Sequence, residues 1–311
     1  MKKNVVVTGG AGFIGSHIVD ALMEDDRAGN VLVIDNLSNG SMDNIDHHKG
    51  NPRFHFEKID IRDYSQLKEV IKGYHLLSHQ AALGSVPRSI EDPITTNAVN
   101  IDGTLNVLKS AVDHHLERVV LACSSSTYGD SKDLPKVEAN IGNPLSPYAV
   151  TKYVNELYAD VFHKTYGLDY IGLRYFNVFG PRQSPDNPYA AVIPLFYKAM
   201  IEGKSPVING DGQTSRDFTY VDNVVLANIN ALFTDNKGAL NEVYNVACGE
   251  QTSLNQMVDA INQALGTSIE ARYGHERMGD IKHSLADITK IRQLLNYQPE
   301  VRFDEGIATV L

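Results

Sequence analysis

A glycine-rich stretch near the start of the chain constrains the fold more than any other feature. Residues 9–15 read Gly-Gly-Ala-Gly-Phe-Ile-Gly, follow the apolar run Asn4–Thr8, and precede Ile14, Ile18 and Leu22 at helical spacing. Glycines at this spacing permit a tight turn and let the N–H groups of a helix N-terminus approach a diphosphate. The motif predicts a strand–turn–helix unit that holds a dinucleotide through Gly9, Gly12, Phe13, Ile14 and Gly15.

Strand and helix patterns alternate through the first half of the chain. Further strand-like runs occur at 31–34, 53–57, 75–79, 119–123 and 169–175. This alternation predicts an α/β fold, a Rossmann-type doubly wound parallel sheet with helices on both faces. After residue 176 the sequence becomes rich in Pro, Gly and Asn, with helices expected at 193–200, 222–233, 253–265 and 287–295.

This change of amino-acid composition after residue 176 predicts two domains. We expect a dinucleotide-binding domain over residues 1–176 and a smaller C-terminal α/β substrate domain over 177–311. Part of 217–246 is expected to belong to the first domain, because 243–246 has the pattern of another strand of the same sheet.

Composition excludes several classes of protein. The 28 Lys and Arg against 38 Asp and Glu give a net charge of −10, which argues against a nucleic-acid partner. Cys123 and Cys248 are too few for a disulfide framework and are expected to be buried. No apolar run approaches the ~18 residues that span a bilayer, so we expect a cytoplasmic protein with no membrane partner. The histidine spacing predicts no metal site.

Asp35 follows the second predicted strand, twenty residues after Gly15. A carboxylate at this place accepts both hydroxyls of an adenosine ribose and repels a 2′-phosphate. Residues 36–40 contain no Lys or Arg that would attract such a phosphate, so the spacing favours NAD over NADP. Simple packing is an alternative for the pairs 60–61 and 81–82. The further cofactor contacts we expect are Asn36, Asp60, Ile61, Gln80, Ala81 and Ala82.

Tyr148 and Lys152 lie four residues apart on a predicted helix that begins at Ser146 and Pro147. A phenol has a pKa of ~10, and a nearby ammonium or an oxidised nicotinamide lowers the pKa. The pair therefore suits a base that takes a proton from an alcohol. A chance pair on an ordinary amphipathic helix is the alternative. A third partner is expected among serines 124–126, after the fifth strand, where a solvated turn is the alternative.

Taken together, these residues resemble the extended short-chain dehydrogenase/reductases, and among them the nucleotide-sugar epimerases. The resemblance covers nearly the whole chain, and the branch that acts on N-acetylated UDP-hexoses is the most similar. The segments that carry the resemblance are TGGAGFIG, the QAA of 80–82, SSSTYGD, SPYAVTK, LRYFNVFGPRQ at 173–183, INGDGQTSRDFTYVDN at 208–223 and RMGDIKHSLAD at 277–287.

The resemblance implies an activity, namely NAD-dependent C4 epimerisation of UDP-GlcNAc to and from UDP-GalNAc through a transient 4-keto sugar. Ser124, Tyr148 and Lys152 would be catalytic. Tyr148 and Lys152 would also contact NAD, and Tyr175 would lie near the nicotinamide. In the related 4,6-dehydratases an Asp and a Glu follow the catalytic hydroxyl residue. Serines at 125 and 126 therefore favour epimerisation over dehydration.

The resemblance also assigns the substrate contacts. Arginine suits a diphosphate because its planar fork matches phosphate bidentately. Ser284 would leave room for an N-acetyl group at C2. The alternatives are ion pairs of Arg216 with Asp217 and of Arg277 with Asp280, and a helix-capping role for Ser284. The expected contacts are Ser85, Ser125, Ser126, Asn177, Ile193, Asn209, Arg216, Arg277, Asp280 and Ser284.

Other substrates and functions stay open at this point. A carboxylated or C3-substituted UDP-N-acetylhexosamine could meet Arg88 or Lys282, and UDP-Glc/UDP-Gal is a further alternative. A 4,6-dehydratase or a decarboxylase has less support. A non-catalytic NAD sensor is disfavoured by the intact Tyr148 and Lys152. The resemblance further implies a homodimer that packs helices at about 97–114 and 148–165 into a four-helix bundle.

Overall fold

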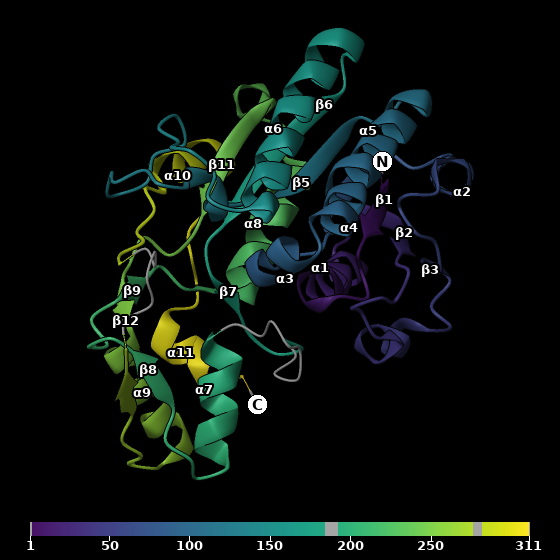
Figure 1. Ribbon diagram of the computed structural model, residues 1–311. Helices are drawn as coiled ribbons and strands as arrows, with labels where there is room; N and C mark the ends of the chain where they lie inside the picture. Colours follow the sequence, from purple (N-terminus) through teal and green to yellow (C-terminus); the bar gives the residue numbers. More distant parts are fainter. Residues whose placement is uncertain (1, 184–191, 276–281, 311) are drawn as a thin grey trace.

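The computed structural model describes residues 2–183, 192–275 and 282–310 (Figure 1). A seven-stranded sheet runs in the order β11–β6–β5–β4–β1–β2–β3, and every neighbouring pair is parallel. All six strands predicted in the first half are present, and the predicted return of a strand near 243–246 is confirmed. The strands are β1 Lys3–Thr8, β2 Ala28–Ile34, β3 Phe54–Glu57, β4 Leu76–His79, β5 Arg118–Ser124, β6 Asp169–Tyr175 and β11 Glu242–Val246.

Helices cover both faces of this sheet, as Figure 1 shows. The alternation along β1 explains the two layers: Val5 and Val7 enter one hydrophobic core, and Val6 enters the other. The first core includes residues of α1 (Phe13–Glu24), α8 (Val221–Phe233) and α10 (Thr289–Leu295), and the second includes residues of α2 (Tyr64–Val70), α5 (Gly103–Asp113) and α6 (Pro147–Tyr166).

The strand order reverses between β1 and β4. The connection from β1 leads through α1 to β2 on one side, whereas β4 lies on the other side of β1. Ligands of open α/β sheets bind in the crevice beyond the carboxyl ends of the strands at such a reversal. The fold therefore places the glycine-rich turn, which follows β1, at the floor of this crevice.

A smaller group of elements packs around a third hydrophobic core. Phe179, Phe218, Tyr220 and Phe303 form its aromatic centre, with ring centroids 5.3–6.4 Å apart. Its elements are α7 Val192–Ile201, α9 Leu254–Leu265, α11 Phe303–Ile307 and the strand pairs β7 Val178–Phe179 with β10 Thr219–Tyr220, β8 Val207–Asn209 with β13 Arg272–Gly274, and β9 Ser215–Arg216 with β12 Thr252–Ser253.

Local signals explain where several of these helices begin and end. The predicted capping box of Ser253 and Gln256 is confirmed, and Gly266 ends α9 in the left-handed conformation (φ +64°). The helix predicted from residue 287 begins only at Thr289. Asp287 lies outside it, and its carboxylate accepts the Thr289 N–H at 2.7 Å.

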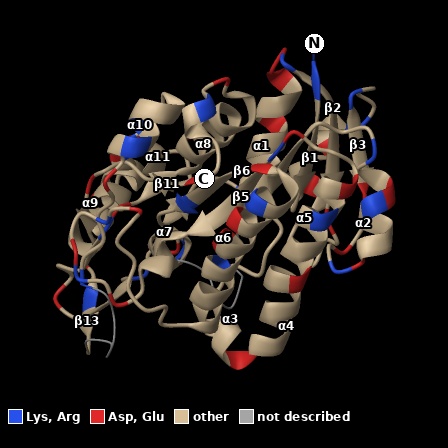
Figure 2. Ribbon diagram, turned by 90° about the horizontal axis from the view of Figure 1, so that it is seen from above, with Lys and Arg blue, Asp and Glu red and all other residues tan. Residues whose placement is uncertain are grey.

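The remaining short elements connect these layers. They are α3 Val86–Glu91, α4 Pro93–Asn97, a π-helical turn Ala98–Asp102, and 3₁₀ turns at Met42–Asn44, Asp46–His48, Ser125–Tyr128 and Lys237–Ala239. Basic and acidic residues are interspersed over the ribbon (Figure 2). Among the helices that the structure describes, none has the length and hydropathy needed to cross a bilayer.

Candidate active site

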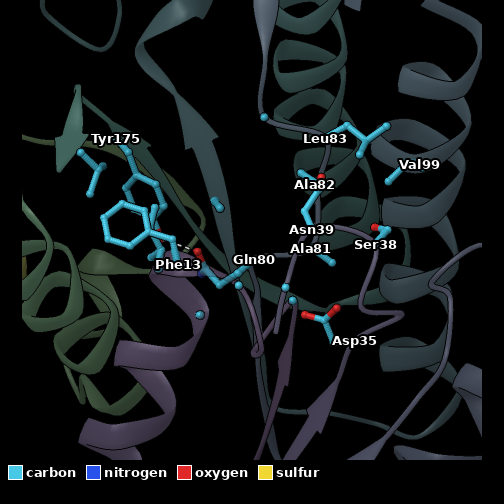
Figure 3. Close-up of a pocket in the computed structure, with 18 of the residues that line it drawn as sticks. Phe13, Asp35, Ser38, Asn39, Gln80, Ala81, Ala82, Leu83, Val99 and Tyr175 are labelled. Carbon is cyan, nitrogen blue, oxygen red and sulfur yellow. Dashed lines mark hydrogen bonds between the residues drawn. The ribbon is translucent and has the colours of Figure 1, made fainter. Parts of the chain in front are cut away.

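A pocket opens at the carboxyl edge of the sheet, where the strand order reverses. Figure 3 shows Phe13, Gln80 and Tyr175 in the left half of the view, and Asn39, Leu83, Val99 and, lowest, Asp35 in the right half. Every residue that the sequence assigned to the cofactor lines this pocket: Gly9, Gly12, Phe13, Ile14, Gly15, Asp35, Asn36, Asp60, Ile61, Gln80, Ala81, Ala82, Tyr148, Lys152 and Tyr175.

The glycine turn leaves no space for side chains where the backbone must come close. Gly9 has φ +70°, and a Cβ there would lie 2.6 Å from the Ala81 nitrogen. A Cβ on Gly15 would lie 2.1 Å from the Gly9 oxygen. No side chain caps α1 at Gly12, so its first N–H groups face the pocket without a side-chain acceptor. This arrangement fits the diphosphate of a dinucleotide.

Asp35 is fixed at the end of β2 by the backbone around it. Its Oδ2 accepts the Ala11 N–H at 3.0 Å, and its Oδ1 accepts the Leu37 N–H at 2.8 Å. Burial raises the pKa of this carboxyl group above its usual value. Each oxygen keeps a second lone pair for a ligand hydroxyl, which fits an adenosine ribose.

Asp60 is already engaged by protein groups. Its carboxylate accepts hydrogen bonds from Arg62 and, at 2.9 Å, from the Asn36 side chain. Hydrogen bonding to Arg62 holds the Asp60 pKa well below its usual range. Asn36 and Asp60 thus form one hydrogen-bonded pair in the pocket wall, a detail that the sequence did not predict.

The Tyr148 and Lys152 pair lies at the start of α6. The Ser146 side chain accepts the Ala149 N–H at 3.1 Å, so the predicted cap is confirmed. The Lys152 Nζ lies 6.0 Å from the Tyr148 ring centroid and donates to the Ala122 carbonyl at 2.7 Å. Burial lowers the pKa of Lys152 to about 8.

The pKa of Tyr148 departs from the sequence-based expectation. Burial raises it above the ordinary value of the phenol, and hydrogen bonding with Ser124 only partly opposes this shift. The sequence predicted a pKa lowered by the neighbouring Lys152 and by the positively charged nicotinamide of the cofactor. In the chain by itself, removal of the phenol from water is the largest effect on this pKa, and the Lys152 ammonium group is directed to the Ala122 carbonyl.

The three consecutive serines face this end of the pocket instead of forming a solvated turn. Ser124 is buried, and its hydroxyl accepts the Ser126 N–H at 3.2 Å and contacts the Ser126 hydroxyl. Ser125 and Ser126 also line the pocket. Within the described lining the only carboxylates are Asp35 and Asp60, which belong to the β2 and β3 side. The Tyr148 side therefore presents hydroxyl groups and no acid.

A polar network behind the pocket was not found from the sequence. The Tyr175 hydroxyl donates to Gln80 Oε1 at 3.1 Å and accepts from Asn228 at 2.8 Å. Gln80 in turn donates to Ser78 at 2.9 Å and to Asn228 at 3.1 Å. Asn228 comes from α8, about 150 residues along the chain from Ser78. The network fixes the Tyr175 ring, which the sequence expected near the nicotinamide.

The predicted substrate residues that the structure describes form two groups, a first group that lines the pocket and a second group that does not. Asn177 lines the pocket with Ser125 and Ser126, and its amide donates to the Asp217 carbonyl at 3.0 Å. Ser85 caps α3, and Ile193 is buried in the third core beside α9. Arg277 and Asp280 lie outside the described residues. The pocket lining does not include Ser85, Ile193, Asn209, Arg216 or Ser284.

Two residues of the second group meet at β9. The Ser284 N–H donates to the Ser215 carbonyl at 3.1 Å, and Arg216 donates to the Lys282 carbonyl at 3.3 Å. Ser284 lies five residues before α10, so it does not cap that helix. Arg216 and Ser284 thus sit on adjoining segments of the smaller group of elements.

Asp217 holds the same segments from inside. It is fully buried, and its carboxylate accepts the N–H groups of Cys248, Gly249 and Ala286 at 3.0–3.1 Å. Burial raises the pKa of this carboxyl group to about 7. These backbone contacts replace the surface ion pair with Arg216 that the sequence left as an alternative for Asp217.

Several lining residues lay outside the sequence predictions. Arg182 stands in the segment 173–183 that carried the family resemblance, and Asn39 follows Asp35 by four residues, so proximity in sequence was the available signal. Within the described lining, Lys152 and Arg182 are the basic side chains. The additional lining residues are Ile34, Ser38, Asn39, Gly40, Asn44, Ile59, Leu83, Gly84, Val99, Ala122, Cys123, Val178, Arg182 and Gln183.

Comparison with known proteins agrees with this geometry. The profile of the NAD dependent epimerase/dehydratase family matches residues 5–247. A putative UDP-glucose 4-epimerase from Methanocaldococcus jannaschii is 40% identical over 99% of this chain and 97% of its own length. A UDP-glucuronate 4-epimerase from Thermodesulfobacterium geofontis is 35% identical over 97% and 93%.

Solved structures extend the likeness to three dimensions. A UDP-N-acetylglucosamine 4-epimerase from Methanobrevibacter ruminantium, in complex with UDP-N-acetylmuramic acid, superposes with a TM-score of 0.93 at 44% identity, over 100% of this chain and 97% of the other. A Thermus thermophilus UDP-glucose 4-epimerase complex with NAD gives 0.87 at 34% identity, over 99% and 97%. The chain therefore belongs to the NAD dependent epimerase/dehydratase family of extended short-chain dehydrogenase/reductases, and its cofactor is NAD.

Proposed function

We propose that this UDP-sugar 4-epimerase interconverts UDP-GlcNAc and UDP-GalNAc. One observation carries the proposal: Ser124, Tyr148 and Lys152 meet at one end of the dinucleotide pocket, with hydroxyl groups at 125 and 126. A dehydratase would need an acid and a base there to remove water across C5 and C6. Serine hydroxyls cannot fill that role at neutral pH, so the site supports epimerisation.

The residues divide the work according to their chemistry. Bound in this pocket, NAD supplies a hydride acceptor that returns the hydride to the sugar. The Tyr148 phenolate takes the proton of the sugar 4-hydroxyl, and the Ser124 hydroxyl, which interacts with Tyr148, holds the same sugar oxygen. The Lys152 ammonium stabilises the phenolate. In the closing half of the reaction Tyr148 gives its proton back to the 4-oxygen.

Ser284 supports the choice of an N-acetylated sugar. Its half-buried side chain is small and lies on the segment that β9 holds through Ser215. In the nucleotide-sugar epimerases that this chain resembles, a bulky aromatic residue at the position of Ser284 excludes substituents at C2 of the sugar. The Methanobrevibacter ruminantium relative is a UDP-N-acetylglucosamine 4-epimerase, which supports the same choice.

The test is turnover with matched substrates. The protein, purified without added cofactor, is incubated with UDP-GlcNAc, UDP-Glc and the uronate of UDP-GlcNAc in parallel, and the sugar nucleotides are resolved by NMR. We expect a UDP-GlcNAc/UDP-GalNAc mixture. Conversion of UDP-Glc alone would refute the N-acetyl assignment and leave the mechanism intact, whereas a 4-keto-6-deoxy product would refute epimerisation.

Variants at Ser284 test directly whether the small side chain at this position admits the N-acetyl group at C2. We expect Ser284→Tyr to lose turnover of UDP-GlcNAc while residual turnover of UDP-Glc persists, because the phenol fills the space for the acetamido group. Ser284→Ala is the matched control and should keep both activities. Equal losses on both substrates in Ser284→Tyr would contradict this role of Ser284.

A C3-substituted sugar is a second candidate. The Methanobrevibacter ruminantium relative was solved with UDP-N-acetylmuramic acid, which carries a carboxylated ether at C3. Arg88, which bonds Asn39 at the pocket wall, is a cation that could meet such a carboxylate. UDP-N-acetylmuramic acid is therefore added to the panel. Its turnover in preference to UDP-GlcNAc would favour this candidate.

We also propose that two copies of the chain form a homodimer through α6 in the cytoplasm. Val150, Leu157 and Val161 leave 46–51% of their surfaces exposed on this helix. Ile90 and Ile94, at 63% and 82%, lie on the neighbouring α3 and α4. The second bundle helix, 97–114, stays a prediction, and one face of it buries Val107, Leu108 and Ala111 in its own subunit. The buried free thiols of Cys123 and Cys248 fit a reducing compartment.

A further inference from the structure

Three potential metal ligands meet on the side of α1, apart from the Tyr148 end of the pocket. Asp20 belongs to α1, while His47 and His48 belong to the 3₁₀ turn between β2 and β3. One ligand atom from each residue lies within 4.8 Å of the other two. The sequence spacing had predicted no metal site, because Asp20 is 27 and 28 residues away from the two histidines.

Both imidazoles converge on a single carboxylate oxygen. His47 Nε2 lies 2.8 Å and His48 Nε2 lies 2.7 Å from Asp20 Oδ1. The two ring centroids are 4.1 Å apart with planes inclined by 45°. Hydrogen bonds to one shared oxygen require a proton on each Nε2, so these two protons occupy the position that a cation would take.

The turn that carries the histidines is held in place. Ile45, directly before it, is fully buried in the first core, and the His48 N–H donates to the Ile45 carbonyl at 3.1 Å. The Asn44 side chain donates to the Ala11 carbonyl at 2.9 Å, which ties the turn to the glycine-rich loop. These contacts therefore hold His47 and His48 beside Asp20 without the help of an ion.

The donor set matches a borderline divalent cation. Two imidazole nitrogens with one carboxylate oxygen are typical zinc ligands at ~2.0–2.2 Å. Tetrahedral bonds of this length separate the ligand atoms by about 3.3 Å. Each Nε2 must therefore move about 0.5 Å further from Asp20 Oδ1 to make room for the ion. His47 can yield, since 48% of its side chain is exposed, and water can take the fourth position.

The second oxygen of Asp20 already has the partner that such sites need. Arg182 Nη2 lies 2.8 Å from Oδ2 and leaves Oδ1 for the histidines. His17 contacts the adjacent Pro181 carbonyl at 3.1 Å. Metal-bound carboxylates are usually oriented by an outer partner of this kind. Because Arg182 also lines the central pocket, the three ligands lie one side chain away from the cofactor site.

We propose that Asp20, His47 and His48 form a binding site for a divalent transition metal of the zinc class. On binding, the ring proton of each neutral imidazole shifts from Nε2 to Nδ1, the ion takes the place between both Nε2 atoms and Oδ1, and Oδ2 stays with Arg182. The site is distinct from the residues that carry the epimerisation, which is metal-free in the proposed mechanism.

The test measures metal binding without any sugar nucleotide, so its result does not depend on the proposed function. The full chain, loaded with NAD, is treated with a chelator, dialysed, and titrated with Zn²⁺ by calorimetry at pH 7.5. Co²⁺ serves as a second probe, because tetrahedral Co²⁺ absorbs visible light strongly. We expect one Zn²⁺ per chain, an intense visible cobalt band, and weaker binding at acidic pH, where imidazoles are protonated.

Variants assign the ligands. His48→Gln should weaken Zn²⁺ binding by more than the ~10–100-fold that loss of an outer partner costs, and should abolish the cobalt band. His55→Gln is the matched control, because His55 is an exposed histidine of the neighbouring β3. Activity of metal-free His48→Gln equal to wild type would show that the variant is folded. Absence of Zn²⁺ binding, or equal affinity in His48→Gln and wild type, would overturn the proposal.

Discussion

Burial shifts the pKa values of Tyr148 and Lys152, the two side chains of the proposed proton transfer, in opposite directions. It raises the pKa of Tyr148 and lowers that of Lys152 to about 8, so both neutral forms are favoured in the chain alone. A phenolate therefore forms readily only when additional positive charge approaches Tyr148. The oxidised nicotinamide carries such a charge, so in the proposed mechanism bound NAD would favour the Tyr148 phenolate.

The first prediction concerns Tyr148. Replacing it with Phe removes the proton acceptor and keeps the ring, so we expect kcat to fall by about 10²–10⁴ with little change in KM. Epimerisation of UDP-GlcNAc followed by NMR measures this. Tyr153→Phe on the same helix is the control, because Tyr153 does not line the pocket. A Tyr148→Phe enzyme with near wild-type kcat would exclude Tyr148 as the base.

The second prediction concerns Lys152 and pH. Because its pKa is about 8, the side chain loses its charge as pH rises through that value, and stabilisation of the phenolate is lost. We expect kcat to decline above about pH 8. Lys152→Arg keeps a charge at every accessible pH, so its profile should lack this alkaline decline, whatever its absolute rate. An unchanged decline in the variant would assign it to another group.

At the scale of elements, a buried ion pair joins α6 to β6. Arg174 donates to Glu156 twice, from Nε at 2.9 Å and from Nη2 at 2.7 Å, and both side chains are at most 6% exposed. The Arg174 guanidinium also lies 4.9 Å from the Tyr128 ring centroid. Glu156 is one helical turn beyond Lys152, so this ion pair helps to set how α6 lies on the sheet.

The third prediction tests that pair. Glu156→Ala leaves the Arg174 charge buried without its partner, and we expect the free energy of unfolding to fall by about 3–5 kcal/mol. The double variant Glu156→Leu/Arg174→Met removes both charges and should cost less. Urea denaturation followed by circular dichroism measures both. A double variant less stable than Glu156→Ala would show that the ion pair itself supplies net stability.

At the scale of the whole molecule, α3, α4 and α6 expose large aliphatic side chains that a partner surface could bury. Ile90, Ile94, Val150, Leu157 and Val161 lie on three elements that pack against one another. Large exposed apolar areas of this kind mark protein interfaces. In the proposed homodimer, this surface of one subunit packs against the same surface of the other subunit.

The fourth prediction tests this surface. Leu157→Glu/Val161→Glu places two carboxylates on α6, and we expect the protein to sediment as a monomer in analytical ultracentrifugation. Leu195→Glu is the control, since Leu195 is 48% exposed on α7, far from α6 in Figure 1. Dimerisation of the α6 variant, or a wild-type monomer at micromolar concentration, would contradict the proposed interface.

The sequence by itself determined the local features. The turn at Gly9–Gly15, the cap at Ser146, the capping box of Ser253 and the strand at 169–175 were all predicted and are present. Each depends on backbone and side-chain contacts between residues that are near in the chain. The Rossmann topology followed from the order of these elements, because parallel strands joined by right-handed crossovers leave few arrangements.

Only the tertiary structure decided features that join distant segments. Asn228 reaches Tyr175 from α8, Asp20 meets His47 and His48, and Asp217 holds the segment around Ala286. The direction of the Tyr148 pKa shift also belongs here, because it depends on how much water the assembled fold removes from the phenol. Burial and long-range contacts arise only when the layers pack, so a reading of residue spacing along the chain could not supply them.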